Sequence, residues 1–195
     1  MPVKIPTIFL FALILFAACN SDYTPRPRGY FKIPLPKHEY RVFDMPGYPY
    51  TFEYPVYASI AKDTTFFEEK AENPYWINID FPSFAGRVYI SYKDVSNNFE
   101  KLREDSYKMT YKHTQKATSI NDSLMQTPLG VGGVFFHVGG NAATGRQFFL
   151  TDTNRHFLRG ALYFDSTPNV DSLDDVNRFL EEDLRHLINT FRWKG

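Results

Sequence analysis

Cysteine is almost absent from this sequence: Cys19 is the single one among 195 residues. One cysteine excludes an internal disulfide and a zinc site made of several thiolates, so we expect the hydrophobic core alone to hold the fold. A surplus of positive charge is also absent, since 22 basic and 22 acidic residues give a formal net charge of +0. Nucleic-acid-binding proteins usually have a basic surplus, so we expect no nucleic-acid partner.

Long apolar runs are absent except near the N-terminus. Residues 7–18 carry no charge, Lys4 precedes them and small residues close the run, which is the pattern of an export signal. About a dozen helical residues reach about 18 Å, whereas a bilayer core is about 30 Å thick, so the run is too short for a stable span. Residues 1–18 are therefore predicted to be a signal peptide.

The cysteine follows this run directly. Phe16-Ala17-Ala18-Cys19 resembles a lipobox, in which the cysteine thiol receives a diacylglyceryl group, although Leu is more usual where Phe16 stands. Ordinary signal peptidase is the alternative: its cut after Ala18 fits poorly because Phe16 takes the place of a small residue, and its cut after Cys19 would leave no lipid. We therefore expect Cys19 to be the lipid attachment site. Two or three acyl chains on this residue would hold the protein firmly at a membrane.

Prolines gather after the cysteine. More than half of the 13 prolines fall between residues 25 and 55, and Pro25-Arg26-Pro27-Arg28-Gly29 favours an extended, fairly stiff chain. Residues 19–45 are therefore predicted to be a lipid-anchored tether whose later part, with Tyr40 and Phe43, packs against the domain. Its basic residues either contact anionic headgroups or are simply solvated.

The remaining residues, 46–195, are predicted to form one α+β domain. Aromatic residues make up 17% of the sequence, which favours strands. Alternating patterns predict strands at residues 49–54, 56–61, 76–81, 87–92, 134–138, 147–151 and 156–164.

Two amphipathic helices are also predicted. The first begins at Asn97 as N-cap, with Glu100 completing a capping box. The second begins near Ser172, buries an apolar stripe from Leu173 to Phe191, and exposes Glu181, Glu182 and Arg185. The elements follow one another in the order strands, helix, strands, helix, and connections of hairpin length join the strands. This predicts an antiparallel sheet flanked by two helices, a layout that resembles the PsbP/Mog1-like α/β/α sandwich.

Candidate chemical groups are few. Residues 140–145 have the glycine spacing of a phosphate loop, but Arg146-Gln147 stands where Lys-Ser/Thr is needed, so a hairpin loop is predicted. His137 and His156 on neighbouring strands either bind a metal with nearby aspartates or pack structurally, and the latter is favoured because no metal-ligand spacing is present. We expect no metal site and no cofactor.

An arginine pair is the one candidate ligand site. Arg155 and Arg159 are expected on the same face of a strand, where two guanidiniums side by side would bind a carboxylate or phosphate. The alternative is that they pair with Asp152, Asp165 or Asp174. Nucleophile, base and oxyanion donors do not assemble anywhere, so the protein is predicted not to be an enzyme.

Several long segments resemble one family, the GldD gliding-motility lipoproteins of Bacteroidetes-type bacteria. These segments are DYTPRPRGYF (residues 22–31), YTFEYP (50–55), MTYKHTQKA (109–117), VGGNAATGRQFFLTD (138–152), HFLRGALYF (156–164) and TFRW (190–193). The resemblance implies an envelope lipoprotein required for gliding and for the associated type IX secretion system. No catalytic residue or cofactor comes with it, and only Cys19 matches a position with a defined chemical role.

The resemblance also implies partners among other envelope motility and secretion proteins. Contact surfaces to test are the aromatic residues Tyr30, Phe31 and Tyr40, or the arginine pair. Asn20 lacks the aspartate that retains enteric lipoproteins in the inner membrane, which favours the outer membrane. The alternative function is a lipid-anchored binding module for a small anion or peptide, which a pocket lined by Arg159 and His137 would favour.

Overall fold

A computed structural model describes residue 29 and residues 32–63, 65–66 and 69–194. The predicted signal peptide, Cys19, Tyr30 and Phe31 lie outside the described residues. The folded unit begins at Ile33, not at residue 46, because β1 (Tyr40–Phe43) pairs with β2 (Tyr50–Pro55). The later part of the predicted tether is thus a strand of the domain.

The larger sheet has seven strands in the order β3-β6-β7-β11-β10-β9-β8, and every neighbouring pair is antiparallel. All the predicted strands are present, most with shifted ends; the one predicted at residues 49–54 is β2 of the second sheet, and the seven-stranded sheet also contains β8, which was not predicted. The strands are β3 (Ser59–Lys62), β6 (Ile77–Phe81), β7 (Gly86–Asp94), β8 (Ala117–Gln126), β9 (Gly132–Gly140), β10 (Arg146–Thr151) and β11 (His156–Phe164). A short hairpin pairs β4 (Thr65–Phe66) with β5 (Glu69–Lys70).

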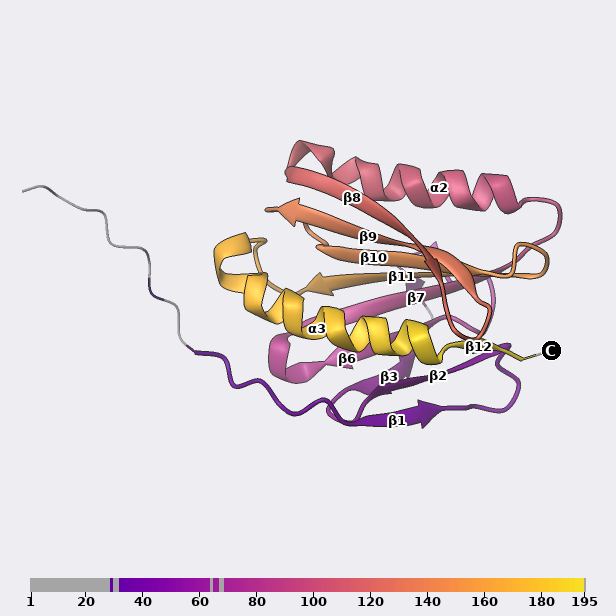
Figure 1. Cartoon of the computed structure of the whole chain (residues 1–195), viewed down its shortest axis with the longest axis horizontal. Coiled ribbons are helices and arrows are strands. Elements are labelled where there is room, and N and C mark those ends of the chain that lie inside the picture. Colours follow the sequence, from indigo (N-terminus) through magenta and orange to yellow (C-terminus); the bar gives the residue numbers. More distant parts are fainter. Residues whose placement is uncertain (1–28, 30–31, 64, 67–68, 195) are drawn as a thin grey trace, which may run out of the picture. The chain divides into compact units, whose positions relative to one another are not determined.

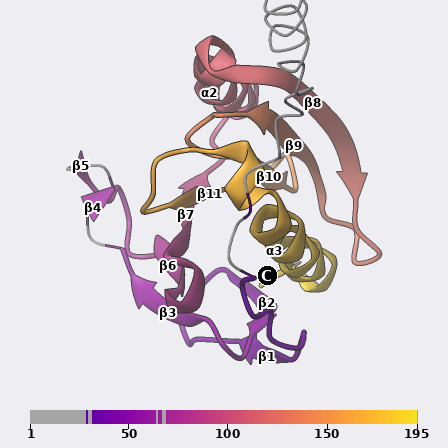
Figure 2. The same cartoon turned by 90° about the vertical axis from the view of Figure 1, so that its left-hand side faces the viewer.

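The two faces of this sheet are covered by different elements (Figure 1, Figure 2). Successive strand residues point to opposite faces, so Phe135 of β9 joins the core with α3 (Val170–Thr190), whereas the adjacent Phe136 packs with Leu102 of α2 (Phe99–Tyr111). The predicted α+β fold, an antiparallel sheet flanked by two helices, is confirmed. We call the two sides the α2 face and the α3 face.

A three-stranded sheet completes the α3 side. Its order is β1-β2-β12, with β12 formed by Arg192–Trp193. Tyr50 and Phe52 of β2 stack with Phe191 at the end of α3, and all three rings are buried. The end of the described chain is therefore fixed to the segment that follows the tether.

The helix starts differ from the prediction. Asn97 does not cap α2: its φ of 57° is left-handed, and the N-cap residue is Asn98, whose side-chain oxygen accepts a hydrogen bond from Ser96 N rather than from the helix. The capping box with Glu100 is wrong. For α3 the cap is Asn169, which accepts from Asp171 N at 3.1 Å, so the helix begins before Ser172.

The strand β8 is absent from the predictions. Its residues, ATSINDSLMQ, are mostly polar and mostly exposed, so no alternation marks them as a strand. Pairing with β9 over its whole length forms it instead.

Among the described residues, no helix combines the length and the apolar character that crossing a bilayer requires.

Candidate functional site

The two arginines of the predicted anion site do not project side by side. Arg155 is exposed and lies in the turn before β11, whereas Arg159 lies within β11 and is only 8% exposed. Asp152 organises this turn, because its Oδ1 accepts hydrogen bonds from the backbone N of Asn154, Arg155 and His156. Burial opposes ionisation of Asp152, but these donors outweigh it and lower its pKa.

Arg159 is embedded between the sheet and α2. Its guanidinium donates to Gln147 Oε1, which also accepts from Thr110 Oγ1 of α2 at 3.1 Å. Burial lowers the pKa of Arg159. The alternative, in which the two arginines pair with Asp152, Asp165 or Asp174, is not found among the ion pairs of the described residues. Arg159 therefore joins α2 to β10 and β11.

His137 lies on the other side of the sheet. On the α3 face its ring is 3.7 Å from Glu181, and Arg146, directly opposite on β10, donates to the same carboxylate. Burial and the Arg146 charge lower the pKa of His137. Because Arg159 is on the α2 face, no single pocket is lined by both His137 and Arg159, the geometry that would favour the anion-binding alternative.

The glycine loop between β9 and β10 borders a small cavity. The cavity measures about 40 Å³, and its lining includes Gly140, Gly145 and Arg146. Small-molecule sites measure about 300–1,000 Å³, so a nucleotide does not fit. The predicted hairpin loop agrees with this geometry.

The second histidine of the weak metal hypothesis is packed. His156 is buried, its Nδ1 is 2.6 Å from the Tyr92 hydroxyl, and its ring stacks on Trp193. Burial lowers its pKa. No three His, Cys, Asp or Glu side chains gather as a metal site within the part of the chain that the structure describes.

A further polar cluster surrounds a buried carboxylate that the sequence analysis did not select. Asp183 of α3 is 1% exposed. Its Oδ1 lies 2.7 Å from His38 Nδ1 and accepts from the Tyr40 hydroxyl at 3.0 Å, while its Oδ2 accepts from the Tyr57 hydroxyl. Burial, together with Asp183, raises the pKa of both tyrosines, so they remain neutral donors. We call these four residues the Asp183 clamp.

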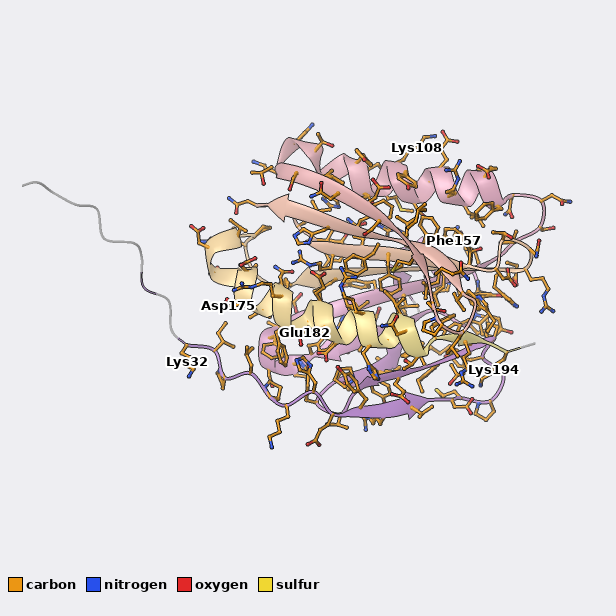
Figure 3. All side chains as sticks on the ribbon, in the orientation of Figure 1. Lys32, Lys108, Phe157, Asp175, Glu182 and Lys194 are labelled. Carbon is orange, nitrogen blue, oxygen red and sulfur yellow. The ribbon has the colours of Figure 1, made fainter. Side chains whose placement is uncertain are left out.

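Neighbouring contacts extend the clamp along α3. His38 Nε2 is 3.1 Å from Glu182, an exposed residue that Figure 3 labels on α3, and the His38 ring stacks on Phe179. The Tyr40 ring stacks on His186, which also pairs with Glu53 of β2 at 2.7 Å. The segment that leaves the tether is thereby fixed to α3 before β1 begins.

The sequence contained a signal for this cluster. Asp183 falls within the apolar stripe of the helix, between Leu180 and Leu187. A carboxylate in a buried stripe needs hydrogen-bond donors, because a buried charge without partners is costly. Two of its three partners, His38 and Tyr40, come from residues assigned to the tether, so the pairing was not predictable from local pattern.

Comparison with known proteins adds the family. No curated protein matches the chain. Among solved structures, the chain is similar to cyanobacterial PsbP (CyanoP) from Synechocystis, with 11% identity and a TM-score of 0.48 over 82% of this chain and 95% of that chain. A family model described as gliding motility lipoprotein GldD matches residues 20–193. Since that match spans nearly all of the sequence after Cys19, the chain belongs to the gliding motility lipoprotein GldD family.

Proposed function

We propose that the protein is a non-enzymatic accessory of gliding motility and of the associated type IX secretion system, acting through protein contacts while anchored by Cys19. The family itself implies a membrane-anchored envelope lipoprotein with an accessory role in motility. The match over residues 20–193 carries the proposal, because it begins directly after the predicted lipid attachment site. The outer membrane is the proposed location.

The Asp183 clamp supports an anchored mode of action. Ile33 is the first residue of the folded unit, and the chain from Cys19 to Ile33 reaches at most about 50 Å when fully extended. A domain held this close to a membrane meets its neighbours at a high effective concentration, so weak contacts suffice. His38 and Tyr40 make the clamp the point at which the tether joins the domain.

The buried polar groups support a structural rather than a chemical role. Asp183 fixes the N-terminal segment, Arg146 pairs with Glu181, and Arg159 bonds Gln147. Each of these charged groups is engaged in holding two elements together. A catalytic acid or base would instead need to face a substrate cavity.

Deletion of the gene in its host tests the proposal. We expect a verified deletion strain to lose surface spreading and the export of type IX cargo, and a plasmid copy of the wild-type gene to restore both. A copy carrying Cys19→Ser should restore neither, because the unanchored protein leaves the membrane surface. Normal spreading and export in the deletion strain would refute the proposal.

A further inference from the structure

Two arginines are buried on opposite faces of the seven-stranded sheet, and they differ in their partners. Arg146, on the α3 face, is 3% exposed and donates to the Glu181 carboxylate and to Gly145 O. Arg159, on the α2 face, is 8% exposed, and its one acceptor among the described residues is the amide oxygen of Gln147. A buried charge is costly unless an opposite charge accompanies it. The α2 face therefore holds a cation for which the described residues supply no counter-charge.

The groups around Arg159 respond to this positive charge. Burial lowers the pKa of Arg159, and the one described side chain that opposes this effect is the phenol of Tyr163. His113 lies in η2 (Lys112–Gln115), the short helix that follows α2; burial lowers its pKa, and the Arg159 charge lowers it further. A neighbouring carboxylate would raise both pKa values. Positive charge thus remains between the sheet and the end of α2.

Gln147 places a second buried donor without an acceptor beside the guanidinium. This residue is 0% exposed, its Oε1 accepts from Arg159 and from Thr110 Oγ1, and its Nε2 is enclosed without a hydrogen-bond partner among the described residues. Reversing the amide would turn an N–H toward Arg159 and remove the oxygen that the guanidinium bonds. A guanidinium and an amide nitrogen donate and do not accept, so this cluster has more donors than acceptors.

The donors and their enclosure define a class of ligand. A planar guanidinium matches the paired oxygens of a carboxylate or a phosphate. Arg159 lies beside the last turn of α2, which contacts Gln147 through Thr110. A small dissolved ion can reach a group that is so enclosed, whereas a lipid headgroup or an acidic side chain on a partner's surface brings a bulky body with it. The ligand that suits the cluster is therefore small, negatively charged and rich in acceptor oxygens.

We propose that Arg159 and Gln147 bind a small dissolved oxyanion, a carboxylate or a phosphate, beside His113. The oxygens of the anion accept from the guanidinium and from Gln147 Nε2, and its charge neutralises Arg159. Because Thr110 of α2 bonds the same glutamine, the bound anion stabilises the contact between α2 and the strands β10 and β11. Arg155, exposed in the turn before β11, takes no part. This inference goes beyond the proposed function, which requires no ligand.

Gln147→Glu tests the charge argument most sharply. The substitution keeps the size of the side chain and an oxygen for Arg159 and Thr110, and it adds the missing carboxylate. We expect the variant to be at least as stable as the wild type without added oxyanion, and to gain nothing further from one. Arg159→Met removes the charge and should also abolish the stabilisation by oxyanions, whereas Arg155→Ala, a change of a nearby exposed arginine, should leave it intact.

Thermal unfolding of the full mature lipoprotein in an uncharged detergent measures this stabilisation. Sodium phosphate, sodium acetate and sodium chloride are compared at pH 7 and equal ionic strength, and the shift seen in Arg159→Met is subtracted, because salts also act on the whole protein surface. Phosphate, acetate or both should raise the wild-type melting temperature by about 4 °C at about tenfold the dissociation constant. In the same titration the NMR signals of the Gln147 side-chain amide should shift.

Three results would overturn the inference. These are a rise with phosphate and acetate no larger than the rise with chloride, an equal rise in Gln147→Glu, and a rise that leaves the Gln147 amide signals unchanged. The proposed function is tested separately, because none of these measurements depends on spreading or export. Failure of the anion site therefore leaves the proposed function standing, and a deletion strain that spreads normally leaves the anion site standing.

Discussion

Asp183→Ala is expected to lower the free energy of unfolding by about 3 kcal/mol, because it leaves the hydrogen-bonding groups of His38, Tyr40 and Tyr57 facing an uncompensated gap. The loss should be concentrated at one place. Hydrogen exchange of residues 38–43 should accelerate far more than exchange in β9–β11, since the clamp fixes the N-terminal segment to α3. Urea unfolding monitored by tryptophan fluorescence measures the total change in the free energy of unfolding.

Two matched variants separate the clamp from general helix effects. Glu182→Ala, next to Asp183 but with a side chain 70% exposed, should change stability by less than about 0.5 kcal/mol. Asp183→Asn keeps one acceptor oxygen and should cost less than Asp183→Ala. A loss below about 1 kcal/mol for Asp183→Ala, within the value of one ordinary hydrogen bond, would contradict the role assigned to the clamp.

Glu181→Ala is expected to cost about 3 kcal/mol at pH 7, because it leaves Arg146, which is 3% exposed, as a buried cation without its carboxylate. Adding Arg146→Met in the same chain should recover much of this loss, since an apolar side chain of similar size needs no counter-charge. Urea unfolding of the single and double variants measures both effects. No recovery in the double variant would mean that the cost comes from packing rather than charge.

The same carboxylate should make stability acid-sensitive. Burial raises the pKa of Glu181, but Arg185 and Arg146 outweigh it and the net shift is downward from 4.5. A lowered folded-state pKa contributes stability that is fully present above the unfolded value and is lost as the pH falls through the folded value. Stability should therefore decline below about pH 4.5 in the wild type and decline less steeply in Glu181→Gln. Equal slopes for the two proteins would contradict this.

The sequence predicted the parts of the fold that have a strong local pattern. Alternating aromatic strands such as residues 156–164, and the apolar stripe of α3, are present as expected. Where pairing alone forms the element, local pattern is uninformative, as for the polar strand β8. Glu181 was assigned to a solvated face for a similar reason: its partner Arg146 lies 35 residues away in sequence.

The candidate sites were less predictable than the fold. Strand alternation correctly places Arg159 on one face of β11, but it carries no information on burial, and α2 covers that side chain. The carboxylate Asp183 meets donors up to 145 residues away. Such contacts follow from the packing of β1 and α3, which no spacing rule encodes.

The proposed lipid at Cys19 underlies the proposed function, because anchoring would keep the domain close to its proposed envelope partners. Intact-mass and peptide mass spectrometry of the protein purified from host membranes tests it most directly. We predict a mature chain that begins at Cys19 and carries the mass of a diacylglyceryl group with or without a further acyl chain. An unmodified Cys19 thiol, in a protein recovered from the soluble fraction, would contradict the account.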